Sequence, residues 1–146
     1  MTEQIKLIWL KRVLFVKVLL TLFAWGLPSL LAPEPFLNLF GLSMPTDPTY
    51  LRLLGAAVTA FGVAYWFAYR DPVRNRAILQ AGVVDNGLIT LTVIVLAFTR
   101  GLESWFIGLS GALTGLFCLA FILLMPPRDE GMSQRQSGPP PAEQAP

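Results

Sequence analysis

The chain has 146 residues, of which 54% are hydrophobic and only 14% are charged, a balance far from that of an average soluble domain. The formal net charge is +2, and the basic residues lie beside apolar segments instead of forming a stripe, which argues against nucleic acid as a partner. There is no His and a single Cys, Cys118, so the residues for a disulfide framework, a Cys/His zinc site or haem ligation by His are missing. We therefore expect no metal and no cofactor, and we interpret Cys118 as a small packing residue.

Four segments of the chain are long and apolar enough to cross a bilayer, because a spanning helix needs about 20 mostly apolar residues. We predict an all-α, four-helix transmembrane bundle over residues 1–126, with helices at about 8–32, 50–70, 76–99 and 104–126. Residues 127–146 are rich in Pro, Gln, Ser and Gly, which predicts a disordered cytoplasmic tail.

The first predicted helix carries one internal charge, Lys17. A cleavable signal peptide also starts with basic residues before an apolar run, but Lys17 interrupts this run and no clean cleavage site follows, so we predict an uncleaved helix. The Lys17 amine either snorkels to the inner surface or meets a carboxylate inside the bundle. Pro28 either kinks the helix or marks its outer end.

The longest connection, residues 33–49, is punctuated by four prolines and contains the apolar run 36–40. A segment this short cannot span, and it is too apolar to hang in water. We predict a short helix that lies in the membrane interface or folds over the outer end of the bundle. A lid over a pocket is the functional alternative.

Small residues mark the helix contacts. Five residues fall on one face of the second helix, beside a ladder of small residues: Arg52, Gly55, Thr59, Gly62 and Trp66, with Ala56, Ala60, Ala64 and Ala68. Small residues let transmembrane helices approach closely, so we predict that this is the bundle-facing side, with the small stripe from Gly55 to Gly62 as the seam. In the fourth helix Gly111 and Gly115 are four apart, a spacing that serves either a dimer face or internal packing.

The basic residues predict the orientation. The clusters lie at the N-terminal flank, in the second connection and in the tail: Lys6, Lys11 and Arg12; Arg70, Arg74 and Arg76; Arg128 and Arg135. The first connection has no basic residue apart from Arg52 at its helix edge, and the third has only Arg100. With four spans, all of these clusters fall on one side, so the positive-inside rule places both termini in the cytoplasm.

Ionisable residues inside a membrane are costly and are candidates for function. Asp85 lies about eight residues into the third helix, roughly 12 Å deep at 1.5 Å per residue. Lys17 enters from the same side and Tyr65 lies at comparable depth. Either Lys17 and Asp85 form an ion pair that staples the first and third helices, or an unpaired Asp85 is a proton or cation site.

Arg52 is the second candidate, near the outer end of the second helix. It either pairs with one of the outer acidic residues, which are Glu34, Asp47 and Glu103, or binds an anion or lipid head group beneath residues 36–40. The candidate binding pocket then comprises a set of polar side chains on the second and third helices: Arg52, Thr59, Tyr65, Asp85 and Asn86.

Three elements of the sequence resemble small bacterial membrane proteins of the DoxX-like and BphX-like kind: Arg52-Leu53-Leu54-Gly55, Gly62-xx-Tyr65 and Arg70-Asp71-Pro72. The resemblance covers about half of the chain and rests on packing and turn elements. It implies a four-helix bundle of the inner membrane. Members of this loose group are mostly of unknown function, and some are encoded beside oxidoreductase or aromatic-degradation systems.

The functional expectation has two forms. The first is a non-enzymatic membrane protein that acts as a partner subunit or a small homo-oligomer, in contact with membrane lipids. The second is a small-molecule or lipid-binding protein, or a transporter, with a polar pocket inside the membrane. No pair of carboxylates, activated nucleophile or metal cluster supports an enzyme.

Overall fold

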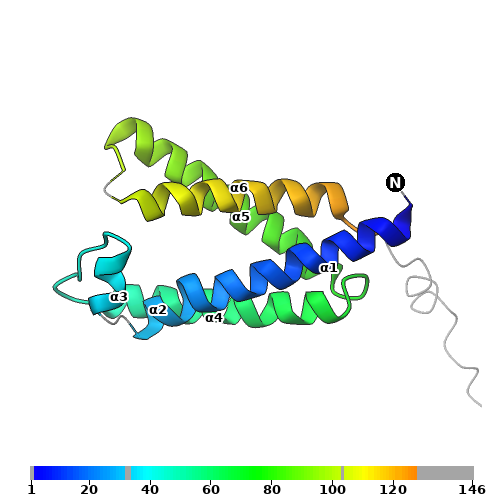
Figure 1. Cartoon of the computed structure of the whole chain (residues 1–146), viewed down its shortest axis with the longest axis horizontal. Helices are drawn as coiled ribbons and strands as arrows, with labels where there is room; N and C mark the ends of the chain where they lie inside the picture. The colour runs from blue at the N-terminus through cyan, green and yellow to red at the C-terminus, as the bar shows by residue number, and fades with distance from the viewer. Residues whose placement is uncertain (1, 32–33, 103, 128–146) are drawn as a thin grey trace, which may run out of the picture.

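The computed structural model describes residues 2–31, 34–102 and 104–127, and in this part of the chain the regular structure is entirely helical. Four helical stretches are long and apolar enough to cross a membrane: Glu3–Leu31, Thr49–Arg70, Arg76–Thr99 and Trp105–Leu124. The first, second and fourth of these run nearly parallel, and the third, Arg76–Thr99, is inclined to them (Figure 1). The predicted all-α four-helix bundle is confirmed, and the protein is a multi-pass membrane protein.

The first stretch is one continuous rod built from three segments: α1 (Glu3–Leu19), the π-helix η1 (Leu20–Gly26) and α2 (Leu27–Leu31). The predicted start near residue 8 is wrong, because the helix begins at Glu3. Its first turn is polar, with Lys6 donating to Glu3 at 3.2 Å, and a polar turn is invisible to a search for apolar runs.

Pro28 explains the wider turn ahead of it. A proline has no N–H, and its ring clashes with the carbonyl oxygen four residues earlier, here that of Ala24. In η1 the helix widens, and the N–H of Leu27 donates to the oxygen of Leu22, five residues back. The helix therefore accommodates Pro28 by a π-helical turn and continues beyond it to Leu31.

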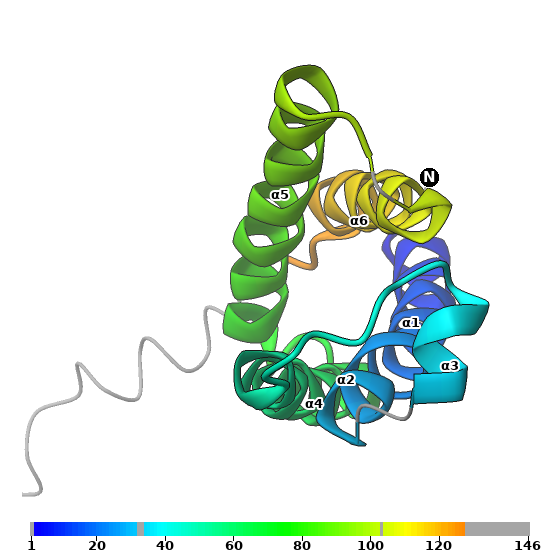
Figure 2. The ribbon, with the colours of Figure 1, turned by 90° about the vertical axis from the view of Figure 1, so that its left-hand side faces the viewer.

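The four spans form a ring in the order α4, first helix, α6, α5 (Figure 2). The helix α4 (Thr49–Arg70) packs along the whole of the first helix, and α5 (Arg76–Thr99) packs along α6 (Trp105–Leu124). The first helix also touches α6 through α1. The contact between α4 and α5 is the weakest of the ring. The bundle thus consists of two tight helix pairs with a looser junction between α4 and α5.

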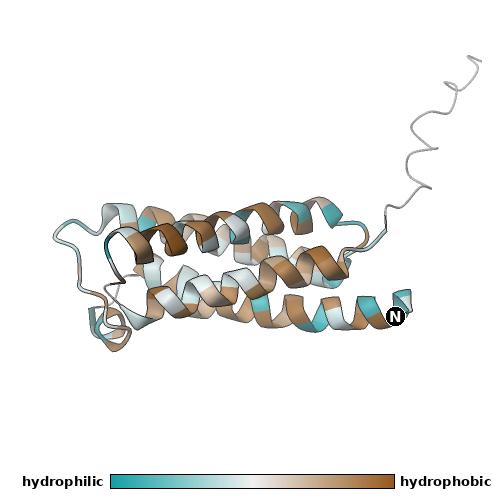
Figure 3. Ribbon diagram, turned by 90° about the horizontal axis from the view of Figure 1, so that it is seen from above, coloured by the Kyte–Doolittle hydropathy of each residue, from teal (hydrophilic) through white to brown (hydrophobic). Residues whose placement is uncertain are grey.

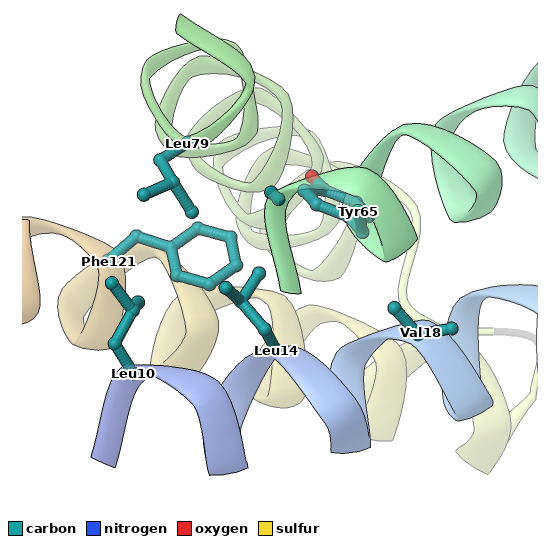
Figure 4. Close-up of a cluster of buried hydrophobic side chains, with 7 residues drawn as sticks. Leu10, Leu14, Val18, Tyr65, Leu79 and Phe121 are labelled. Carbon is teal, nitrogen blue, oxygen red and sulfur yellow. The ribbon is translucent and has the colours of Figure 1, made fainter. Parts of the chain in front are cut away.

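The buried core lies in the half of the bundle that contains the N-terminus. The ring of Phe121 from α6 sits among Leu79 of α5 and Leu10 and Leu14 of α1 (Figure 4). Tyr65 and Ala68 of α4 complete the cluster. All four spans meet in this cluster, whereas the other half of the bundle has no buried cluster of this size among the described residues.

The predicted seam is confirmed at its glycines, where α4 approaches the first helix closely, but part of the predicted bundle-facing side is exposed, namely Arg52, Ala56, Ala60 and Trp66. Gly55 is buried, and a Cβ there would collide with the backbone of Ser29 and Leu30. Gly62 is likewise buried against Leu22. On the partner helix, a Cβ at Gly26 would lie 2.8 Å from the Thr59 hydroxyl oxygen. Small residues on both helices therefore allow this contact.

The glycine pair of α6 lies at the contact with α5. A Cβ at Gly111 would be 2.6 Å from Cγ1 of Val93, and one at Gly115 would be 3.4 Å from Thr90. The pair is therefore used in packing within the chain, which is the second of the two predicted roles.

The outer connection folds over one end of the bundle through α3 (Glu34–Leu39) and the residues after it. The ring of Phe40 lies 4.4 Å from that of Phe106, and the Ser104 hydroxyl donates to the carbonyl oxygen of Phe40 at 2.6 Å. Gly41 ends the short helix with a φ of 66°, a conformation that favours glycine. Of the two predicted arrangements, the one over the outer end of the bundle is therefore formed.

The two ends of the bundle differ in charge. The N-terminus, the α4–α5 turn and the end of α6 lie together at the end opposite to α3 (Figure 1), and polar residues concentrate at the helix ends while the shafts are mostly hydrophobic (Figure 3). The N-terminal end carries the basic clusters of α1 and of the turn, while the α3 end carries two acidic residues, Glu34 and Asp47, and two basic ones, Arg52 and Arg100. The cytoplasmic location of the basic end stays a prediction, and the predicted tail lies, from residue 128 onward, outside the described residues.

Candidate intramembrane binding site

Lys17 points into the bundle. Its side chain is only 4% exposed, and its Nζ donates a hydrogen bond to Oδ1 of Asn86 at 2.6 Å. The expectation that Lys17 snorkels to the surface is therefore wrong. Because α1 already begins at Glu3, Lys17 lies about 21 Å along the rod at 1.5 Å per residue, too deep for its side chain to reach the near end.

From Asn86 the hydrogen bonds continue to Tyr65 and Asp85. The Asn86 side-chain amide donates to the Gly82 carbonyl oxygen at 2.6 Å and to the Tyr65 hydroxyl oxygen at 3.3 Å. The Tyr65 hydroxyl in turn donates to Oδ2 of Asp85 at 3.3 Å. We call Lys17, Asn86, Tyr65 and Asp85 the polar chain. It links α1, α4 and α5 and has an ammonium at one end and a carboxylate at the other.

The expected direct ion pair between Lys17 and Asp85 is not formed. Among the described residues the one salt bridge is the surface pair Lys6–Glu3. Successive residues of an α-helix point about 100° apart, since there are 3.6 residues per turn. Asn86 is fully buried and faces Lys17, and Asp85 is only half-buried. The staple between the first and third spans exists, but its partner on α5 is Asn86.

Aromatic rings surround the Lys17 ammonium. The nitrogen lies 4.8 Å from the ring centre of Phe117, 5.4 Å from that of Tyr65 and 6.0 Å from that of Trp25. An ammonium near an aromatic face gains about 0.5–2 kcal/mol, and more as water is removed. These rings therefore offset part of the cost of burying the charge.

A cavity of about 350 Å³ lies beside the polar chain, between the first helix, α4, α5 and α6. This volume is within the range of about 300–1,000 Å³ that ligand pockets occupy. It is also more than twice that of an apolar cavity of about 150 Å³ known to bind benzene. Its polar lining comes from Lys17, Thr21, Ser29, Asp85 and Ser110, and its other lining residues are Trp25, Leu42, Leu51, Leu54, Val58, Phe61, Ile89, Val93, Phe106 and Ile107.

The cavity opens sideways at the looser α4–α5 junction. Leu54 and Phe61 on α4 and Ile89 on α5 line it, and these residues are 57%, 39% and 38% exposed. At the α3 end the lining includes Leu42, just after α3, and Phe106 at the start of α6. The exposed part of the cavity wall therefore lies on α4 and α5.

Thr21 contributes an unsatisfied hydroxyl to the cavity wall. The residue is 4% exposed, and its Oγ1 has no hydrogen-bond partner among the described residues. The threonines of the regular helices behave differently, since Thr59, Thr90 and Thr114 each donate to the carbonyl oxygen four residues back. Thr21 lies in η1, where the backbone is wound more widely. A buried hydroxyl without a partner costs about 1–3 kcal/mol, so this atom is suited to meet a ligand.

The structure brings together three of the five predicted pocket residues, namely Tyr65, Asp85 and Asn86. Thr59 lies in the seam against Gly26, where its hydroxyl donates to the Gly55 oxygen at 2.7 Å, and it does not line the cavity. Arg52 is exposed and also lies outside the cavity lining. Of the five residues, only Asp85 lines the cavity, and Tyr65 and Asn86 lie beside it in the polar chain, so the predicted pocket is not formed as one unit.

The described acidic residues predicted to pair with Arg52 do not form ion pairs with it. No ion pair joins Arg52 to Glu34 or Asp47, and Glu103 lies outside the described residues. Instead, Asp47 accepts a hydrogen bond from the backbone N–H of Thr49 at 2.9 Å, at the start of α4. The hydrogen bonds from Thr49 lower the pKa of the Asp47 carboxyl, and the positive end of the helix favours an anion at this place.

Sequence reasoning missed a polar stripe on the first helix. Lys17, Thr21, Trp25 and Ser29 are four residues apart, and all of them line the cavity. The indole N–H of Trp25 also donates to the Ser110 hydroxyl of α6 at 2.9 Å. The regular spacing was a usable signal. In an α-helix of 3.6 residues per turn, side chains four residues apart move gradually around the helix axis. The wider turns of η1 offset this movement and keep the four side chains on one face.

No family model, curated protein or solved structure matches this chain. Within the described ranges, no group of three His, Cys, Asp or Glu side chains could hold a metal ion. We therefore infer the function from the cavity and from the polar residues that line it.

Proposed function

We propose that this protein is a non-enzymatic, multi-pass protein of the bacterial inner membrane that binds a lipid or an apolar small molecule in the cavity beside the polar chain. The observation that carries the proposal is a cavity of about 350 Å³ that combines apolar walls, polar groups at one side and a sideways opening. Such a combination is typical of a ligand pocket, in which a few polar groups fix the orientation of a mostly apolar molecule.

The membrane assignment within this proposal has two supports. The basic residues of α1 and of the α4–α5 turn gather at one end of the bundle, as the positive-inside rule requires of a cytoplasmic end. The resemblance of residues 52–55, 62–65 and 70–72 to DoxX-like and BphX-like proteins favours the inner membrane of a bacterium.

A purely structural role explains some of the polar residues but not all of them. Asn86 and Tyr65 have their hydrogen bonds within the bundle, as a staple requires. The hydroxyl of Thr21 and the carboxylate of Asp85 instead line the cavity. Burying the Thr21 hydroxyl without a partner among the described residues costs about 1–3 kcal/mol, and a ligand that hydrogen-bonds to it would remove this cost.

Two valines on α4 provide a matched test. Val58 lines the cavity, whereas Val63 is 46% exposed on the outer surface of the same helix and does not line it. Val58→Trp places a bulky indole in the cavity, and Val63→Trp adds the same side chain on the exposed side of the helix. We expect the wild type and Val63→Trp, purified in mild detergent, to carry a bound molecule in native mass spectra, and Val58→Trp to lose it while keeping its helical circular dichroism. Equal retention in all three proteins would contradict the proposal and favour the partner-subunit alternative.

A further inference from the structure

The side chains that line the cavity have no net formal charge. Its lining contains two ionisable side chains, the ammonium of Lys17 and the carboxylate of Asp85, so its formal charge is zero. The other lining residues are apolar side chains, an indole and hydroxyls. A charged molecule in this site would pair with one of the two groups and be repelled by the other. It would also leave a net charge in a region of low dielectric, where charges are costly.

The polar lining offers both donors and acceptors. The ammonium of Lys17 has three N–H groups, and one of them donates to Asn86. The Thr21 hydroxyl has no partner among the described residues. Asp85 accepts from Tyr65 at Oδ2, and Oδ1 accepts no hydrogen bond within the described chain. A ligand therefore meets donors on the first helix and an acceptor on α5.

We infer that the ligand is a neutral amphiphile, with a single apolar chain and a head group that both accepts and donates hydrogen bonds, such as a hydroxyl. This inference rests on the proposed binding function. The head-group oxygen accepts from Lys17 and Thr21, and its proton is donated to Asp85. The chain lies along the apolar walls formed by α4 and α5. A volume of about 350 Å³ holds roughly a dozen non-hydrogen atoms at about 30 Å³ each, and longer chains leave through the side opening.

Three probes with one chain and different head groups test the inference. Decanol, decanoate and decylamine, each with a diazirine in the chain, are photolysed with the full-length protein in nanodiscs of phosphatidylcholine at pH 7. Labelling is counted by intact mass. We expect the wild type to be labelled by the decanol probe at least tenfold more than by either charged probe, and we expect Val58→Trp to lose this labelling.

Two substitutions change the cavity charge and keep the hydrogen bonds. Asp85→Asn makes the cavity +1 and retains an acceptor for Tyr65. Lys17→Gln makes it −1 and retains a donor for Asn86. We expect Asp85→Asn to be labelled more by decanoate than by decylamine, and Lys17→Gln to show the opposite order. Arg12→Gln removes an exposed charge of α1 outside the cavity and should keep the wild-type order.

The outcomes separate the two proposals. If Val58→Trp blocks labelling, but decanoate or decylamine labels the wild type as well as decanol does, the cavity binds ligands and the inference of a neutral head group is overturned. The same holds if the two charge variants keep the wild-type order. If Val58→Trp leaves the labelling by every probe unchanged, the probes bind elsewhere and the proposed function itself is overturned. If a charge variant fails to fold, the order in which the three probes label the wild type and Arg12→Gln decides whether the ligand is neutral.

Discussion

The close contact between α4 and the first helix predicts that a substitution at Gly55 destabilises the bundle. A methyl group there would collide with backbone atoms of Ser29 and Leu30, and a backbone cannot move aside as the end of a side chain can. Gly55→Ala therefore forces the two helices apart. Since the seam also holds the first helix against α4, the substitution shifts the polar stripe of Lys17 and Thr21 relative to the cavity wall.

The magnitude follows from a comparison with Gly87, in the middle of α5. A Cβ at Gly87 would lie 3.7 Å from the Cys118 sulfur, an ordinary contact. Both Gly→Ala substitutions gain about 1 kcal/mol of helix propensity, which cancels in the comparison. Inserting a methyl group into a packed contact costs about 1–3 kcal/mol. We expect the free energy of unfolding of Gly55→Ala to be lower than that of Gly87→Ala by about 2–3 kcal/mol, because the obstacle is backbone.

The assay is reversible unfolding in mixed micelles, followed by the loss of helical circular dichroism as the denaturing detergent is increased. Wild type, Gly55→Ala and Gly87→Ala are compared at one protein concentration. Gly87→Ala should be as stable as the wild type or slightly more stable. Equal free energies of unfolding for the two variants would refute the reasoning, because they would mean that α4 and the first helix are not in backbone contact.

Three further predictions concern the polar residues. Asn86→Leu leaves the Lys17 ammonium without its hydrogen-bond acceptor and should lower the free energy of unfolding by about 2–3 kcal/mol in the same assay; an unchanged value would show that Lys17 finds another partner. Ser104→Ala removes both the N-terminal cap of α6 and the bond to the outer connection, at about 2 kcal/mol in total, and proteolysis after α3 should become faster; unchanged stability and cleavage would contradict this role. Because the hydrogen bonds from Thr49 lower the pKa of Asp47 below its usual 3.8, its contribution to stability is present above that value and is lost as the pH falls through the lower folded-state pKa. Asp47→Asn should therefore show a weaker loss of stability than the wild type below pH 4, and parallel curves would contradict the assignment.

The fold was predictable because it follows from length and hydropathy, which decide how many helices cross a bilayer. The seam was predictable in part, because the two glycines of α4, Gly55 and Gly62, lie on one face, whereas the alanines Ala56 and Ala60 of the predicted face are exposed. The effect of Pro28 was not, since a proline can end, kink or widen a helix, and the neighbouring helices decide which of these occurs. The start of the first helix at Glu3 was missed because its first turn is polar.

The candidate site was predictable in its members but not in its contacts. Asp85 and Asn86 are adjacent, and α5 is apolar on nearly all sides, so its sequence does not fix which of the two faces α1. Turning α5 about its axis by the angle between two successive residues replaces the predicted Lys17–Asp85 pair with the observed Lys17–Asn86 hydrogen bond. Arg52 was chosen because a charge near a span is unusual, but it is exposed near the helix end, where such a charge is tolerated.

The most direct test of the central claim is to map where the photoreactive decanol attaches to the wild-type protein in nanodiscs. The sideways-open cavity predicts that attachment concentrates on its wall, at Val58 and Phe61 of α4 and Ile89 of α5. The lipid-facing side chains Phe98 and Leu123, which are 89% and 72% exposed, serve as the internal reference. Labelling of the cavity wall well above this reference, and its loss in Val58→Trp, is the predicted result. Labelling in proportion to lipid exposure, with Phe98 and Leu123 ahead of the cavity wall, would contradict the claim.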